Sequence, residues 1–414
     1  MRRSALALLI SSAFVSQSAF AVQPKEVVNH YADIALAVYQ DAGKTAEQLD
    51  IAIKNLIASP SEKNLKSAKA AWLASRVPYQ QSEVFRFGNV VVDDWEGQLN
   101  AWPLDEGMID YVKPGAYHHE LGNAGATANI IANKELQVGT NKLDVSEITP
   151  ELLANLNELA GSEANVATGY HAIEFLLWGQ DLNGTNAGAG ERPYTDFVQG
   201  KECTNGNCER RAEYLQATST LLVSDLAWMQ TQWADKGDNY RSELTAKAPK
   251  EGLRIMLFGM GSLSLGELAG ERMKVALEAN SPEDEHDCFS DNTHNSHYYN
   301  QKGISNVWFG SYARIDGTKV TGPSLNDLVT NTDKMVAKKT STAVSAADSQ
   351  VHTLVSSAEK GIAFDQLIAT GNKSGNALVT ASIKSLVLQT AEIEKAAATL
   401  GITSLNSDTA DHEF

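Results

Sequence analysis

The hydrophobic positions along most of the chain follow the spacing of α-helices. Between residues 26 and 58, apolar side chains recur every three or four positions, as at Val27, Tyr31, Ile34 and Val38, so they share one helical face. Helical spacing returns over six later stretches: 148–160, 163–179, 208–234, 248–279, 324–360 and 375–400.

A second helix is expected to begin after Pro60-Ser61 and to run to about Phe87, with a kink near Pro78, because proline removes a backbone donor. Alternating patterns typical of strands are scarce, and only 89–92 and a few short runs fit one. The predicted fold class is all-α, built from long helices in bundles. Loops rich in Gly, Asn and Asp are predicted over 88–147, 180–207 and 281–300.

The two halves of the chain resemble each other in outline. Each contains a long helix pair, an irregular polar loop, and a helix that ends near Trp and Gly, at Leu177-Trp178-Gly179 and at Trp308-Phe309-Gly310. Such an internal repeat predicts two related bundles. The helical pattern is interrupted within 235–245, which divides the chain into a first bundle at 22–237 and a second at 238–414.

The first 21 residues have the features of a secretory signal peptide. Arg2 and Arg3 precede an apolar run, and Ala19-Phe20-Ala21 forms a small-residue cleavage site. We expect cleavage before Val22 and export of the mature chain, to the periplasm in a cell with two membranes. No later stretch approaches the roughly 18 consecutive apolar residues of a transmembrane helix, so no membrane span is expected.

The 414-residue chain is acidic, with 34 Lys and Arg against 51 Asp and Glu and a formal charge of −17, which becomes −19 without Arg2 and Arg3. Nucleic acid and anionic lipid are therefore poor partners, since binding phosphates needs a basic surface. Metal cations and cationic ligands suit this charge, although acidity also serves solubility alone.

Two of the three cysteines fit an oxidising compartment. Cys203 and Cys208 flank a short polar loop and can close a disulfide. Metal binding by this pair is the weaker interpretation, because no second Cys pair accompanies it. Cys288 is then either a buried thiol or a competitor for the bridge.

The strongest chemical signal is the run from Gly169 to Gly179, in which His171 and Glu174 lie three residues apart among apolar residues. On a helix they share one face. Because burying an uncompensated carboxylate costs several kcal/mol, roughly, Glu174 needs a metal, an Arg or a charged His171 beside it. A purely structural His–Glu hydrogen bond between helices is the alternative.

A second set of polar residues follows one face of the preceding helix. Trp72, Arg76, Tyr79 and Glu83 lie at positions i, i+4, i+7 and i+11, a pattern that suits the polar wall of a cleft. An Arg76–Glu83 surface pair is the alternative. A glycine-rich run over 259–272 predicts close helix packing or an interrupted helix, and would let Glu267 and Arg272 face the same cleft.

A fourth cluster, over 282–297, concentrates His, Asp and Glu around Cys288. It contains His286, Asp287 and His294, which are residue types that bind hard cations, zinc or iron. A solvated acidic loop with helix-capping residues is the alternative. The motifs of zinc peptidase helices, serine hydrolases and dinucleotide-binding folds are absent from the sequence.

Five segments together resemble the imelysin family, also called the insulin-cleaving metallopeptidase family, and its iron-regulated protein A branch. The chain contains Gly169-x-His171-x-x-Glu174 inside an apolar helix. The other four segments are Trp72-Leu-Ala-Ser-Arg76-Val-Pro-Tyr79 with Glu83, Gly97-Gln-Leu-Asn-Ala-Trp102-Pro-Leu-Asp105-Glu106, Gly266-Glu267-Leu-Ala-Gly-Glu271-Arg272-Met, and Asp287-Cys-Phe-Ser-Asp291-Asn-Thr-His294.

The resemblance implies two related four-helix bundles with long irregular loops, and a site in the cleft between them. It further implies iron acquisition in the periplasm or outer envelope, with iron-transport components as partners. We expect His171 and Glu174 to bind iron or another divalent metal such as zinc, with Glu83 as third ligand. Arg76, Tyr79, Trp72, Glu267, Arg272 and Asp105 are expected to line the cleft.

Two functions remain open from the sequence. The favoured one is a periplasmic iron-acquisition protein that binds a metal or metal complex. The alternative is a metallopeptidase in which His171 and Glu174 hold the metal and another carboxylate activates water.

Overall fold

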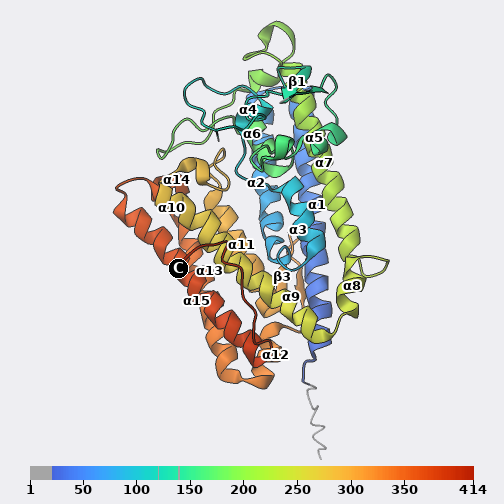
Figure 1. Cartoon of the computed structure of the whole chain (residues 1–414), viewed down its shortest axis with the longest axis vertical. Helices are drawn as coiled ribbons and strands as arrows, with labels where there is room; N and C mark the ends of the chain where they lie inside the picture. The colour runs from blue at the N-terminus through green and yellow to red at the C-terminus, as the bar shows by residue number, and fades with distance from the viewer. Residues whose placement is uncertain (1–20, 120, 139) are drawn as a thin grey trace, which may run out of the picture.

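The computed structural model describes residues 21–119, 121–138 and 140–414, and it is dominated by helices, which confirms the predicted all-α class (Figure 1). The expected signal peptide, apart from Ala21, lies outside the described residues. The longer helices are α1 (Pro24–Ala58), α2 (Glu62–Gln80), α3 (Val90–Leu99), α6 (Gly169–Trp178), α7 (Cys208–Trp233), α9 (Pro249–Ser262), α11 (Thr293–Phe309), α13 (Lys334–Ala358) and α15 (Lys373–Thr399).

Shorter elements connect these helices. The short α-helices are α4 (Glu106–Ile109), α5 (Pro150–Leu156), α8 (Tyr240–Ala246), α10 (Ala276–Ala279), α12 (Leu325–Thr332) and α14 (Phe364–Ile368). Single 3-10 turns form η1 (Glu83–Phe85), η2 (Leu159–Gly161), η3 (Tyr194–Phe197), η4 (Gly200–Glu202) and η6 (Pro282–Asp284), whereas η5 (Leu263–Val275) is a π-helix. Two antiparallel hairpins pair β1 (Glu135–Val138) with β2 (Asn141–Asp144) and β3 (Ser311–Ala313) with β4 (Lys319–Thr321).

The helices gather into two groups that lie side by side (Figure 1). In the first, α1 packs along α2 and α7, and α6 packs against α2 and α7. In the second, α13 lies between α11 and α15, and η5 packs on α15 and α11. Helix α9 leads into η5 and also packs on α1, so it joins the two groups. Helix α7 ends at Trp233 and α8 begins at Tyr240. The division of the chain into bundles at 22–237 and 238–414 stays a prediction.

The two groups meet most closely where α11 crosses the end of α2. A Cβ on Gly303 would lie 2.7 Å from the Gln81 carbonyl oxygen, so glycine is needed for this approach. Asn300 donates hydrogen bonds to the carbonyl and side-chain oxygens of Gln80, and Asn306 donates one to Gln81. Buried amides therefore hold the helices together at this crossing.

Three predicted boundaries were wrong. The expected loop over 88–147 contains α3, α4 and a β-hairpin, and 89–92, expected as a strand, enters α3 instead. This segment is helical because Val92, Trp95 and Leu99, which follow helical spacing, are buried on one face. The expected loop over 281–300 ends early, because α11 begins at Thr293 with polar buried residues that carry no apolar pattern. Helix α2 ends at Gln80, two residues after Pro78.

The glycine-rich run over 259–272 contains a change of helix type, and its glycines also allow another segment to pack closely against it. Helix α9 gives way to the π-helix η5 at Leu263, and π-helical turns are frequent at functional sites. Cβ atoms at Gly266 and Gly270 would lie 2.9 Å from the Asp408 carbonyl oxygen and 2.3 Å from the His412 ring. The C-terminal segment therefore runs directly along η5.

Candidate functional site

Helix α6 carries the first two candidate residues. Its first residue, Gly169, has a φ of +78°, and a Cβ there would lie 2.3 Å from the Leu99 carbonyl oxygen. Only glycine lets the start of α6 approach the end of α3 this closely. Every residue of α6 is buried, as the apolar pattern predicted, so His171 and Glu174 lie inside the protein.

His171 and Glu174 contact each other directly. His171 Nδ1 lies 2.9 Å from Glu174 Oε2, and the backbone N–H and hydroxyl of Ser290 donate to Glu174 Oε1 at 3.0 and 2.6 Å. Burial and the nearby Asp287 raise the pKa of Glu174 well above its usual value. Burial and the Arg76 charge lower the pKa of His171 well below its usual value. Because both charged forms are disfavoured, the pair is a hydrogen bond between neutral groups rather than an ion pair.

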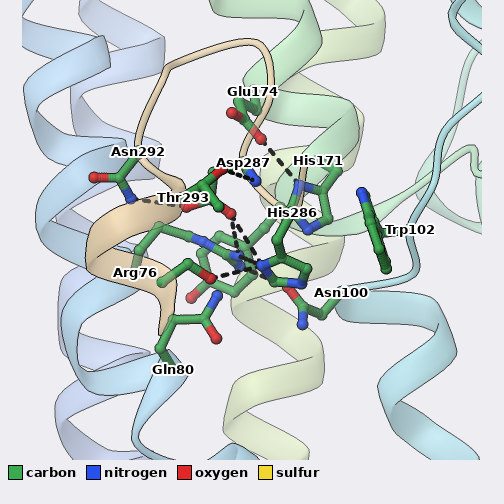
Figure 2. Close-up of polar contacts among 12 residues, drawn as sticks. Arg76, Gln80, Asn100, Trp102, His171, Glu174, His286, Asp287, Asn292 and Thr293 are labelled. Atoms are coloured by element: carbon green, nitrogen blue, oxygen red, sulfur yellow. Dashed lines mark hydrogen bonds and ion pairs between the residues drawn. The ribbon is translucent and has the colours of Figure 1, made fainter. Parts of the chain in front are cut away.

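The loop between η6 and α11 adds His286 and Asp287, which point toward His171 (Figure 2). The His286 and His171 rings meet edge to face with centroids 4.8 Å apart. His286 Nδ1 lies 2.6 Å from Ser296 Oγ. Burial, together with the charges of Arg272 and Arg76, lowers the pKa of His286 well below its usual value, so this imidazole is neutral.

Arg76 ties helix α2 to the same loop. Its guanidinium donates to Asp287 Oδ1 and to Asn100 Oδ1, both at 2.6 Å. Asn292 donates to the other Asp287 oxygen at 2.7 Å. Burial alone would raise the pKa of Asp287, but the Arg76 guanidinium outweighs it and holds this pKa below its usual value. Asp287 is therefore a charged carboxylate beside two neutral imidazoles (Figure 2).

This arrangement has the chemistry of a metal centre. In the described part of the chain, the group of three potential ligands gathered tightly enough to hold one ion is His171, His286 and Asp287, with one donor atom of each within 4.8 Å of the others. The Nε2 atoms of both imidazoles are buried and have no hydrogen-bond partner among the described residues. Neutral imidazole and carboxylate are ligands that zinc and iron accept.

Glu83, expected as the third ligand, belongs instead to a network around Arg272. The Arg272 guanidinium lies 2.9 Å from Glu83 and 2.7 Å from Glu267, and it donates to Asn300 at 2.6 Å. Arg86 lies 3.6 Å from Glu267 on the outer side of this network. The structure thus brings Glu83, Glu267 and Arg272 together with one another, but it does not gather Glu83 with His171.

Three other residues expected to line the cleft lie either in the interior beside Arg76 or at the start of α4. Trp72 and Tyr79 are fully buried, and the Arg76 guanidinium lies 5.3 and 5.7 Å from their ring centroids. Both rings therefore pack beside Arg76 in the interior rather than lining an open cleft. Asp105 accepts hydrogen bonds from Tyr117 and Asn123 at the start of α4, apart from the residues around His171.

An open pocket of about 320 Å³ leads from the surface to His286. Asn100 and Trp102 form part of its lining, with Glu267 and Arg272 from η5. The Trp102 and His286 ring centroids lie 5.5 Å apart, and Trp102 Nε1 donates to the Glu285 carbonyl at 2.6 Å. Of the residues expected to line a cleft, this pocket includes Glu267 and Arg272, and the buried His286 also belongs to its lining.

Sequence reasoning named His286 and Asp287 as members of a cluster of metal-binding residue types over 282–297, but it did not connect them with His171. They lie more than 100 residues from His171, and no spacing rule connects the two segments. The available signal was the adjacent His286-Asp287 pair, which lies a few residues before helix α11. The polar residues at the start of α11 indicate that hydrogen bonds hold this helix in place. Asn100 and Ser290, which support these residues, gave no comparable signal.

The cysteines lie apart from this group. Cys203 and Cys208 are joined in a disulfide, as expected, just before and at the start of α7. Cys288 is a free, half-buried thiol next to Asp287. Burial and the surrounding carboxylates, Glu174 first among them, raise the pKa of this thiol well above its usual value, so it is an unreactive neutral group.

Comparison with known proteins relates this architecture to one family. The chain matches the Imelysin family model over residues 35–393. It is 22% identical over 293 residues to iron-regulated protein A of Synechococcus elongatus, an alignment that covers 69% of this chain and 63% of that protein. The matched region thus spans less than two thirds of that relative's length.

Two solved structures share the fold at low sequence identity. A Parabacteroides distasonis protein assigned as an iron-regulated protein A precursor superposes with a TM-score of 0.65 at 17% identity, covering 91% of this chain and 94% of that one. An imelysin-like protein from Psychrobacter arcticum superposes with a TM-score of 0.59 at 15% identity, covering 92% and 98% of the two chains. The match to the family model over most of its length shows that this chain belongs to the imelysin family.

Proposed function

We propose that this chain is an exported protein of bacterial iron acquisition that binds a divalent metal ion, iron or zinc, between its two helical groups. His171, His286 and Asp287 are the proposed ligands. The single observation that carries the proposal is the presence of two buried, neutral imidazoles with unpartnered Nε2 atoms beside a charged carboxylate.

The contacts of the other ring nitrogen, Nδ1, support His171 and His286 as metal ligands. Histidine ligands usually donate their other ring nitrogen to a carboxylate or another oxygen, which fixes the ring and raises its basicity. Glu174 occupies this position on Nδ1 of His171. Nδ1 of His286 lies 2.6 Å from Ser296 Oγ and 3.4 Å from the Arg76 guanidinium. Glu174 is therefore proposed as the residue that orients His171, not as a direct ligand. A bound ion would act as a Lewis acid at this position.

The two Nε2 atoms are costly to bury without a partner. A buried polar atom that forms no hydrogen bond costs about 1–3 kcal/mol, and this applies to Nε2 of both imidazoles. Arg76 already compensates Asp287, so an added cation would have to share that carboxylate with a guanidinium. The site thus favours an ion that takes two strong nitrogen ligands and one oxygen, which suits zinc or iron better than calcium.

The link to iron rests on the relatives. The Synechococcus elongatus protein carries the name iron-regulated protein A, and the Parabacteroides distasonis protein is an iron-regulated protein A precursor. Export is supported by the N-terminal sequence pattern and by that precursor. Within the described chain, no helix has both the length and the apolar character needed to cross a membrane. Components of envelope iron transport are the proposed partners.

The metallopeptidase alternative would use the same ligands but needs a further carboxylate to activate water. Glu174 already contacts His171 and Ser290 through its two oxygens, and Glu83 is paired with Arg272. These contacts favour a binding site over a hydrolytic one.

Calorimetric titration of the mature protein with Zn²⁺, and with Fe²⁺ under anaerobic conditions, tests the proposal. We expect one ion per chain for the wild type and loss of binding in both His171→Ala and His286→Ala. His352→Ala, on the exposed face of α13, is the matched control and should bind normally. Unchanged binding in both site variants would refute the assignment.

A further inference from the structure

The pocket that leads to His286 is lined mainly by acidic side chains. Its 320 Å³ volume is open to solvent. At its inner end lies the His286 ring, which is 1% exposed and has an unpartnered Nε2. The carboxylates in the lining are Asp93, Glu96, Glu158, Glu163, Glu267 and Glu271.

The positive charges in the same pocket are already neutralised. Arg86 lies 3.1 Å from Asp93 and 3.4 Å from Glu96. Arg272 is buried between Glu83 and Glu267. Neither guanidinium is therefore free to receive an anionic ligand, because each would first have to give up an ion pair.

The outer carboxylates, in contrast, are free. Glu158 and Glu163 are exposed and form no ion pair or side-chain hydrogen bond among the described residues. Glu271 contacts His412 of the C-terminal segment at 2.9 Å. The mouth of the pocket thus carries unpaired negative charge, which raises the local concentration of cations and speeds their approach.

We infer that this pocket is the route by which the proposed metal site is filled, and that it admits a hydrated free divalent cation and disfavours an anionic metal chelate. The inference rests on the proposed function and specifies its substrate class. At about 30 Å³ of liquid volume per water molecule, a cation with six waters occupies roughly 200 Å³ and fits the pocket. An anionic chelate of similar or larger size meets the unpaired carboxylates of Glu158 and Glu163. The Arg86 and Arg272 guanidiniums are already paired with carboxylates.

Stopped-flow measurement of Zn²⁺ association with the mature protein tests the inference. In the double variant Glu158→Gln/Glu163→Gln we expect association to slow by roughly two- to fivefold at low ionic strength, and the difference to vanish at about 0.5 M salt. Glu359→Gln/Glu394→Gln, which removes two exposed carboxylates that do not line the pocket, should associate like the wild type. Dissociation rates and stoichiometry should be equal in all three proteins.

The outcomes separate the inference from the proposed function. Equal association rates for wild type and Glu158→Gln/Glu163→Gln at low salt would overturn the inference while leaving the metal site intact. Tighter binding of ferric citrate than of Zn²⁺ would overturn it as well. If the wild type takes up no Zn²⁺ or Fe²⁺ at all, the proposed function itself fails.

Discussion

At the scale of single residues, Glu174 is proposed to orient the metal ligand His171 without contacting the ion itself. Its oxygens contact His171 Nδ1 and Ser290, and burial raises its pKa well above the usual value. In the apo protein the carboxyl group therefore tends to hold a proton. A cation on His171 Nε2 would favour the charged carboxylate, since a charged partner strengthens the imidazole as a ligand.

Glu174→Gln should separate these two roles. Glutamine resembles the protonated carboxyl in size and polarity, so we expect the free energy of unfolding of the apo protein to change by less than about 1 kcal/mol. Metal affinity should fall by about 10- to 100-fold, because the imidazole loses its anionic partner. Titration calorimetry and urea denaturation measure the two effects. A stability loss without an affinity loss would show that the pair is only structural.

At the scale of elements, helix α6 is placed by its first residue. The φ of +78° at Gly169 lies in the left-handed region, and the backbone of Leu99 leaves no space for a side chain. This contact fixes the register of α6 against α3, and with it the positions of His171 and Asn100.

Gly169→Ala should lower the free energy of unfolding by about 2–4 kcal/mol, from backbone strain and overlap together. Gly184→Ala is a matched control, because Gly184 also has a positive φ of +62° but would place its Cβ in open space. The control should lose only about 1 kcal/mol. Equal losses in the two variants would mean that close packing against Leu99 contributes nothing.

Some of these elements could be predicted from the sequence alone, and others could not. Helices α1, α7 and α15 were predictable because their buried faces are apolar and periodic. The start of helix α11 was not, because its first half is buried through polar contacts, such as those of Asn300, that leave no periodic signal. His171 was recognisable from its buried helix, whereas its neighbours His286 and Asp287 reach it only through the packing of the two helical groups.

At the scale of the whole molecule, several buried carboxyl groups hold protons that they would release on unfolding. Burial is the main cause at each: it raises the pKa of Glu106 to about 8 and those of Glu96 and Asp291 to about 7. The folded state therefore binds more protons than the unfolded state between about pH 5 and 8. Stability consequently falls as the pH rises through these folded-state values.

Urea denaturation of the apo protein, with a chelator present, should show this slope. We expect the free energy of unfolding to drop by about 1–2 kcal/mol between pH 7.0 and 8.5, because these carboxyl groups lose their protons in the folded state over this interval. The variant Glu106→Gln should flatten the slope, because Glu106 has the highest pKa of these three carboxyl groups. Stability that rises over this interval would contradict the assigned burial effects.

The central claim, a metal centre at the junction of the two helical groups, is tested most directly by anomalous diffraction from crystals of the Zn²⁺-loaded protein. We predict one anomalous peak among His171, His286 and Asp287, about 2.0–2.2 Å from an imidazole nitrogen, with Glu174 still in contact with the other nitrogen of His171. A peak elsewhere in the fold, or none at saturating metal, would contradict the account.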